Sequence, residues 1–135
     1  HYIPHTDRTR FKTKGEAGYM ENLVLACYDC NRNKGDYSVS DHYKSELYPD
    51  GQGIVHCYYR DEDYYIRLNP EKKADIDIVN FYYQLRLGQE IHRLDYLLMS
   101  LKGLRDKYSE SNEIYSIFSS AIMLMQEKRN VGIGV

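Results

Sequence analysis

Two cysteines three residues apart, Cys27 and Cys30, are the side chains of this sequence whose spacing most directly indicates chemistry. Two thiolates at this spacing in a turn form half of a tetrahedral zinc site. The same spacing occurs in dithiol redox centres, so the pair indicates either metal binding or redox chemistry. The sequence has only three cysteines, too few for a disulfide framework, and no βαβ pattern surrounds the pair. We therefore favour metal binding and keep redox chemistry as the rival.

A histidine and several polar residues accompany the cysteine pair in a definite order. The sequence opens with His1-Tyr-Ile-Pro, continues through a polar loop, and reaches Asn22 just before a short apolar run. Asn31, Arg32 and Lys34 follow Cys30 directly. A neutral imidazole, with a pKa near ~6.5, is the natural general base at cellular pH. Each of these residues is common alone, and the order of the whole set is what makes the pattern specific.

This order resembles the HNH nuclease family, also called the His-Me finger or ββα-metal nucleases. The resemblance covers residues 1–36 and is carried by His1-x-x-Pro4, a loop, Asn22-Leu23, and Cys27-x-x-Cys30-Asn31-x-x-Lys34. It implies a metal-dependent endonuclease that hydrolyses DNA phosphodiester bonds with His1 as general base. The resemblance also implies that Asn22 holds the loop and orients the His1 ring. Asn31 is then expected to ligate a catalytic Mg²⁺ or Mn²⁺ through its side-chain oxygen.

Two features of the family would fall before residue 1. The family has an acidic residue or a second histidine immediately before the motif histidine, and its zinc-binding members have an earlier Cys-x-x-Cys pair. We therefore expect this chain to be the C-terminal part of a longer protein. Cys27 and Cys30 are expected to bind a structural Zn²⁺. Cys57 is an alternative third ligand, although its position on a predicted strand favours a small buried side chain.

The charge distribution points to the N-terminal quarter as the surface for DNA. Residues 1–34 hold six basic and four acidic side chains, whereas the whole chain has a net charge of −2. Arg32 and Lys34 are the candidates for contacts with backbone phosphates. The sequence also has 15 tyrosines, among them the pairs Tyr58-Tyr59 and Tyr64-Tyr65. These pairs could stack on bases or pack against a neighbouring helix.

The periodicity of the sequence changes at Asn69. Before it we expect short strands at 1–4 and 23–26, and a β-hairpin of residues 54–59 and 64–68 around an acidic turn. Asn69-Pro70-Glu71 predicts a capped start for a helix that runs to about Leu87. Two further helices are predicted from apolar residues at helical spacing, which are Ile91, Leu94, Leu98, Leu101, Leu104 and Tyr108, and then Ile114, Ile117, Phe118, Ala121, Ile122 and Met125.

We predict an α+β fold with two regions. Residues 1–41 are the zinc-stapled ββα-metal nuclease module, and residues 42–135 are a hairpin plus a three-helix tail packed on it. The tail is expected to dock a protein partner or the N-terminal remainder of the same protein. No apolar run approaches the ~18–20 residues of a membrane span, and we expect a cytoplasmic protein.

Two functions from different classes are consistent with these residues. The first is a DNA endonuclease, of a kind that often serves in restriction or anti-phage defence. The second is a catalytically dead, zinc-stabilised domain that binds nucleic acid or acts as a scaffold. The presence of His1, Asn22 and Asn31 together favours the enzyme.

Overall fold

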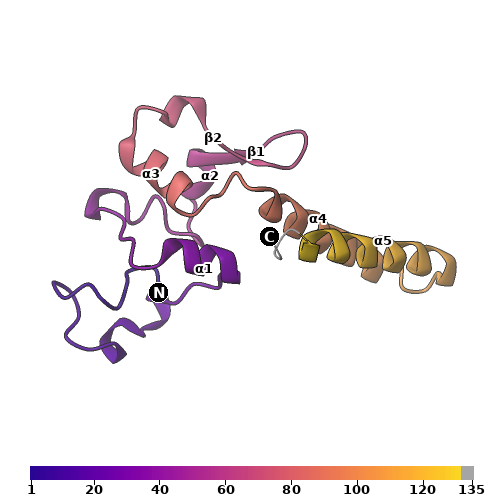
Figure 1. Cartoon of the computed structure of the whole chain (residues 1–135), viewed down its shortest axis with the longest axis horizontal. Coiled ribbons are helices and arrows are strands. Elements are labelled where there is room, and N and C mark those ends of the chain that lie inside the picture. Colours follow the sequence, from indigo (N-terminus) through magenta and orange to yellow (C-terminus); the bar gives the residue numbers. More distant parts are fainter. Residues whose placement is uncertain (132–135) are drawn as a thin grey trace. The chain divides into compact units, whose positions relative to one another are not determined.

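The computed structural model describes residues 1–131, which contain five α-helices and one two-stranded β-hairpin (Figure 1). This mixture confirms the predicted α+β class. The chain divides into two compact units. The first comprises His1–Tyr59 and Arg67–Gly88, and the second comprises Arg60–Ile66 and the chain from Gln89 onward. The sequence-based boundary at residue 41 therefore falls inside the first unit.

The N-terminal segment of the first unit is irregular. Residues 1–4 and 23–26, predicted as strands, lie outside any regular strand, and two short 3₁₀ turns, Gly15–Ala17 and Met20–Asn22, lie between them. One main-chain hydrogen bond, from the Tyr2 N–H to the Asn22 carbonyl at 2.8 Å, joins the two ends of this stretch. A single bond brings the segments together without forming the ladder that defines a strand.

Helix α1, Tyr28–Lys34, carries the second half of the motif. It begins at Cys27, whose sulfur accepts a hydrogen bond from the Cys30 N–H at 3.4 Å. It ends at Gly35, where φ is +48°, in the left-handed region that glycine adopts without a steric penalty. The motif residues thus fix both ends of this helix.

Two tyrosines belong to the core of the first unit. The Tyr58 ring is buried against Phe81, with 6.2 Å between the ring centroids, and its hydroxyl donates to the Ile78 carbonyl at 2.7 Å. Tyr2 is also buried, and its hydroxyl donates to the Lys44 carbonyl at 2.8 Å. Each hydroxyl has a main-chain partner, so the rings add apolar surface to the core without an unpaired polar group.

The hairpin and the helix after it differ in extent from the prediction. Residues 54–57 form a short helix, α2 (Ile54–Cys57), so the strands are β1 (Tyr58–Arg60) and β2 (Ile66–Leu68). The predicted cap at Asn69 is confirmed, because its side chain accepts from the Glu71 N–H at 3.1 Å. It caps the 3₁₀ turn Pro70–Lys72, and the helix itself, α3 (Ile76–Gln84), begins later.

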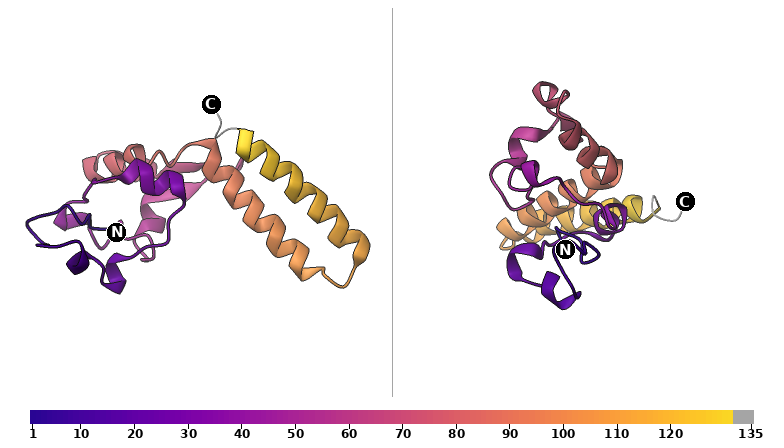
Figure 2. Two further views of the ribbon diagram at one scale, coloured as in Figure 1. Left: turned by 60° about the horizontal axis from the view of Figure 1, so that its bottom comes forward. Right: turned by 90° about the vertical axis from the view of Figure 1, so that its left-hand side faces the viewer.

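The second unit is built on helices α4 (Glu90–Lys107) and α5 (Asn112–Val131), which lie side by side and antiparallel (Figure 1 and Figure 2). Their contact includes stacked rings of Tyr108 and Phe118, with centroids 6.3 Å apart, and an ion pair between Arg129 and Asp95. Both helices match the sequence prediction closely. The remaining predicted helix, the one expected after Asn69, is α3, and it belongs to the first unit.

The turn of the hairpin packs on α4. The Arg60 guanidinium lies 4.2 Å from the Tyr96 ring centroid, and Tyr64 stacks on the same ring at 5.7 Å. Arg93 lies over the Tyr65 ring and donates to the main chain of the turn at 2.7 Å. The Tyr64-Tyr65 pair therefore packs against a neighbouring helix, one of the two alternatives for the paired tyrosines.

No helix within residues 1–131 is both long enough and apolar enough to cross a membrane.

Candidate metal and nuclease site

Asn22 is the most deeply buried polar residue of the motif, with 2% of its surface exposed. Its side-chain oxygen accepts from the Ile3 N–H at 2.6 Å. Its amide nitrogen donates to the Ile3 carbonyl at 2.9 Å and to the Ala17 carbonyl at 2.8 Å. One side chain thus satisfies three main-chain groups and ties the segment after His1 to the loop.

His1 lies beside His5. The two imidazole rings stack with centroids 5.7 Å apart and an interplanar angle of 13°. Sequence spacing contains no signal for the stack, since the polar loop has no periodicity.

Cys27 and Cys30 lie in one turn at the start of α1 and are both half-buried. Their sulfur atoms lie within 4.8 Å of each other, close enough to share a metal ion such as zinc. The Cys30 N–H donates to the Cys27 sulfur, which orients this sulfur at the start of the helix. Soft thiolates with this placement fit zinc, and the pair supplies two of its four usual ligands.

Cys57 has the opposite environment. It is fully buried in the first unit, and its sulfur lies 3.6 Å from a Glu46 carboxylate oxygen and 3.7 Å from the Gly53 carbonyl. Burial, and then the neighbouring Glu46 charge, raise the pKa of the Cys57 thiol to about 11. A thiol that stays protonated is a poor metal ligand. Cys57 therefore acts as a small buried side chain, although on a helix and not on the predicted strand.

The polar residues of α1 differ in how free they are to meet a partner. Asn31 and Arg32 are exposed. Lys34 is half-buried, donates to the Tyr37 carbonyl at 3.1 Å, and has its pKa lowered chiefly by burial. The two candidate phosphate contacts are thus unequal, with Arg32 the more accessible.

A catalytic Mg²⁺ site has less support than the zinc site. Asn31 offers one neutral oxygen, whereas Mg²⁺ is usually bound through one or two carboxylates with water and phosphate oxygens. Within residues 1–131, no group of three acidic or histidine side chains gathers at Asn31. The described residues alone therefore do not make a complete Mg²⁺ or Mn²⁺ site.

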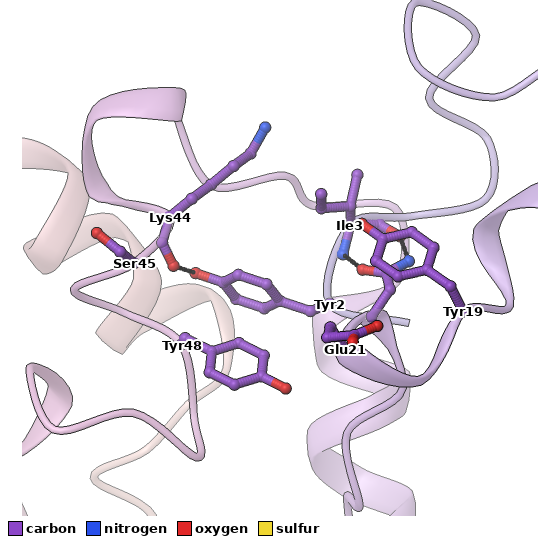
Figure 3. A pocket seen from close by; sticks show the side chains of 8 residues that line it. Tyr2, Ile3, Tyr19, Glu21, Lys44, Ser45 and Tyr48 are labelled. Carbon is purple, nitrogen blue, oxygen red and sulfur yellow. Dashed lines mark hydrogen bonds between the residues drawn. The ribbon is translucent and has the colours of Figure 1, made fainter.

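A hollow of about 330 Å³ opens beside the Tyr2 ring (Figure 3). Tyr2 and Tyr48 meet there edge to face, with centroids 5.3 Å apart, and the Lys44 side chain extends away from both rings. The residues that line the hollow are Tyr2, Ile3, Tyr19, Glu21, Asn22, Lys44, Ser45 and Tyr48. No sequence pattern predicted this hollow, because its walls come from segments with no shared spacing.

Comparisons of the chain with protein-family models, with curated proteins and with solved structures found no match.

Proposed function

We propose that this chain is a metal-dependent HNH endonuclease that hydrolyses DNA phosphodiester bonds and acts in restriction or anti-phage defence. The observation that carries the proposal is the convergence of the motif within one unit. Asn22 fixes the segment that follows His1, and the helix that carries Cys30 and Asn31 belongs to the same compact unit. A motif that were only a chance match would have no reason to converge in this way.

His1 is the general base in this proposal. Hydrolysis of a phosphodiester needs an activated water in line with the leaving 3′ oxygen. The His1 imidazole accepts a proton from this water, and the clamp on Ile3 limits how far the residue can move. The stack with His5 restricts the rotation of the ring. Both contacts favour one orientation of the base, which reduces the cost of reaching the reactive geometry.

Asn31 is the proposed protein ligand for the divalent ion. Such an ion, when bound, stabilises the negative charge that develops on the leaving oxygen. Its remaining ligands have to come from water, from the phosphate or from another segment, because Asn31 supplies a single oxygen. We therefore expect the chain to bind the ion weakly, so that activity needs a high Mg²⁺ or Mn²⁺ concentration. Asn31→Ala should raise this concentration further.

Cys27 and Cys30 have a structural role in this proposal. The zinc they hold keeps the start of α1 in place, and with it Asn31 and Arg32. A module with so little regular structure buries too little to be rigid without such a staple.

A plasmid-nicking assay with Mg²⁺ or Mn²⁺ tests the proposal, with His5→Ala as the matched control for His1→Ala. Removal of a general base typically slows hydrolysis by ~10²–10⁴-fold, and we expect this loss for His1→Ala. His5 only stacks on the base, so we expect His5→Ala to lower the rate by less than about tenfold. Equal rates for the native chain and His1→Ala would refute the assignment.

DNA binding is tested separately from cleavage. Arg32→Glu should weaken binding to a DNA duplex and reduce the slope of its salt dependence. Lys34→Glu should do so less, since its ammonium already donates to the Tyr37 carbonyl. Binding that responds to Arg32 in a chain that never nicks DNA would favour the alternative, a zinc-stabilised binding domain without catalysis.

A further inference from the structure

Helix α5 presents two parallel rows of side chains, and only one of them meets α4. The first row contacts or faces α4, through Tyr115 beneath Arg105, Phe118 against Tyr108, the buried Ile122, and Arg129 paired with Asp95. These residues are spaced by three, four and seven positions, as in a coiled-coil seam. The α4–α5 contact uses this row.

The second row lies one residue away, which is about 100° around the helix. We call it the second seam, and it consists of Ile114, Ile117, Ala121, Leu124, Lys128 and Val131. Its spacing again alternates between three and four. Ile117 is 61% exposed, Leu124 is 68% exposed and Val131 is 72% exposed. An apolar row at heptad spacing with this exposure is the usual mark of a helix that has a further helical partner.

We propose that the second seam is a homodimer interface, in which α5 of one copy packs antiparallel on α5 of a second copy. The seam is complementary to itself when it is reversed. About a twofold axis between Ala121 and Leu124, these two residues face each other, so a small side chain meets a large one. Ile114 faces Val131 in the same register. A single patch that matches its own reversed copy is what a twofold dimer requires.

Charge selects the antiparallel direction. The single charged member of the seam, Lys128, faces Ile117 of the second copy in this register, one helical turn from Glu113 of that copy. Its aliphatic stem can cover Ile117 while its ammonium reaches the Glu113 carboxylate. In a parallel pairing, Lys128 would instead face Lys128, and the like charges would repel each other.

The contacts within one copy leave Lys128 available. Its ammonium lies 3.4 Å from a Glu90 carboxylate oxygen, and the two side chains are 59% and 50% exposed. An ion pair with this exposure contributes little and can be exchanged for another. The dimer would also supply what the helical hairpin lacks, since Leu94 and Ile122 are its only buried apolar side chains within the described residues. Two helical hairpins joined in this way form a four-helix assembly.

Sedimentation equilibrium or light scattering over a concentration series tests the interface in the full chain. We expect a monomer–dimer equilibrium for the native chain. Leu124→Asp should raise the dimer dissociation constant by more than about 30-fold, because it removes a central anchor twice per dimer. Met99→Asp is the matched control, since Met99 is also 68% exposed but lies on α4, and it should leave the dissociation constant unchanged.

A charge exchange tests the direction of packing. Glu113→Lys and Lys128→Glu should each weaken the dimer by about two- to fivefold, and the double variant should restore it. Circular dichroism at 222 nm checks that each variant keeps its helices. A native chain that stays monomeric at every concentration, or an equal loss with Met99→Asp, overturns the interface. A double variant weaker than both single variants overturns the antiparallel register. None of these results depends on nuclease activity.

Discussion

The first unit and the α4–α5 hairpin are stabilised in opposite ways. In the first unit, residues 1–41 have little regular structure, and buried side chains such as Asn22 and Tyr2 hold the main chain through hydrogen bonds. The helical hairpin has 18- and 20-residue helices, but its buried apolar side chains are few. Regular structure and a well-filled core are therefore separated in this molecule.

This difference assigns a different weakness to each region. An irregular loop held by a few specific contacts loses its geometry when one contact is lost, so the candidate site depends on single residues. A two-helix hairpin has good local helix propensity, and each exposed side chain contributes little. We expect the first unit to respond steeply to point substitutions and metal removal, and the helical hairpin to respond mainly to changes along the α4–α5 contact.

We expect the largest effect from removal of the zinc that we propose at Cys27 and Cys30. Structural zinc binding is worth ~10–16 kcal/mol in small metal-stabilised domains, so Cys27→Ser or a strong chelator should unfold residues near α1. The α4 and α5 amides should keep their protection from hydrogen exchange, because neither cysteine belongs to the second unit. Zinc content by elemental analysis and peptide-resolved hydrogen exchange measure the two effects.

Two sets of variants control this experiment. Cys57→Ser should retain the zinc, because the Cys57 thiol stays protonated and pairs with Glu46. Alanine substitution of the other histidines in turn identifies any imidazole that completes the ligand set, and the residues to test are His5, His42, His56 and His92. A Cys27→Ser variant with full zinc content would contradict the metal assignment.

A comparison of predicted and observed elements shows which ones local sequence patterns can predict. Heptad-like spacing from Ile91 to Tyr108 predicted α4 almost to the residue, because helix periodicity is local. The segment 54–57 was predicted as a strand and is helical, since a short apolar run fits either structure. Strands at 1–4 and 23–26 were expected but did not form, because a strand needs a neighbouring partner that local sequence does not specify.

The candidate site likewise has one feature that the sequence predicts and others that it does not. The closeness of Cys27 and Cys30 follows from their spacing in one helical turn, and it was predictable. The partners of Asn22 at Ile3 and the stack of His1 on His5 depend on how the polar loop folds back, which no periodicity encodes. A resemblance could suggest that Asn22 matters, but only the structure identifies the main-chain atoms it holds.

Asn22→Ala tests how strongly the first unit depends on a single buried side chain. The substitution leaves the Ile3 N–H, the Ile3 carbonyl and the Ala17 carbonyl without their partner. Each buried group left unpaired costs ~1–3 kcal/mol, and partial access of water reduces the sum, so we expect a loss of about 3 kcal/mol. Urea denaturation measures the loss. Asn22→Asp keeps the acceptor for Ile3 but places a buried carboxylate oxygen against the Ile3 and Ala17 carbonyl oxygens, so it should cost more than alanine.

Ile122→Ala tests the thin core of the helical hairpin. Large-to-small changes in a core cost ~2–5 kcal/mol, and the low end applies here because the two helices can close over the space. We expect about 2 kcal/mol for Ile122, which is 4% exposed, when stability is measured at low protein concentration. Leu124→Ala in the exposed second seam should cost less than ~0.5 kcal/mol under the same conditions. Equal losses would show that the two rows of α5 are not distinct.

The smallest expected effect is a pH dependence that belongs to the first unit alone. The pKa of the Cys57 thiol is raised from 9.0 to about 11, first by burial and then by Glu46, so the folded state favours the protonated thiol. Well below pH 9 the thiol is protonated in both states, and its contribution to stability is fully present. Between pH 9 and about 11 the unfolded chain releases the proton while the folded chain keeps it, so stability falls as pH rises. Cys57→Ala should flatten this part of the curve in thermal unfolding of the first unit and leave α4–α5 unchanged.

The tyrosines titrate as well, since burial raises the pKa of Tyr2 and Tyr58, but the unfolded chain releases those protons only near pH 10. The difference between the native chain and Cys57→Ala should therefore emerge from about pH 9 upward, and a difference that appears below about pH 8 would contradict the assignment.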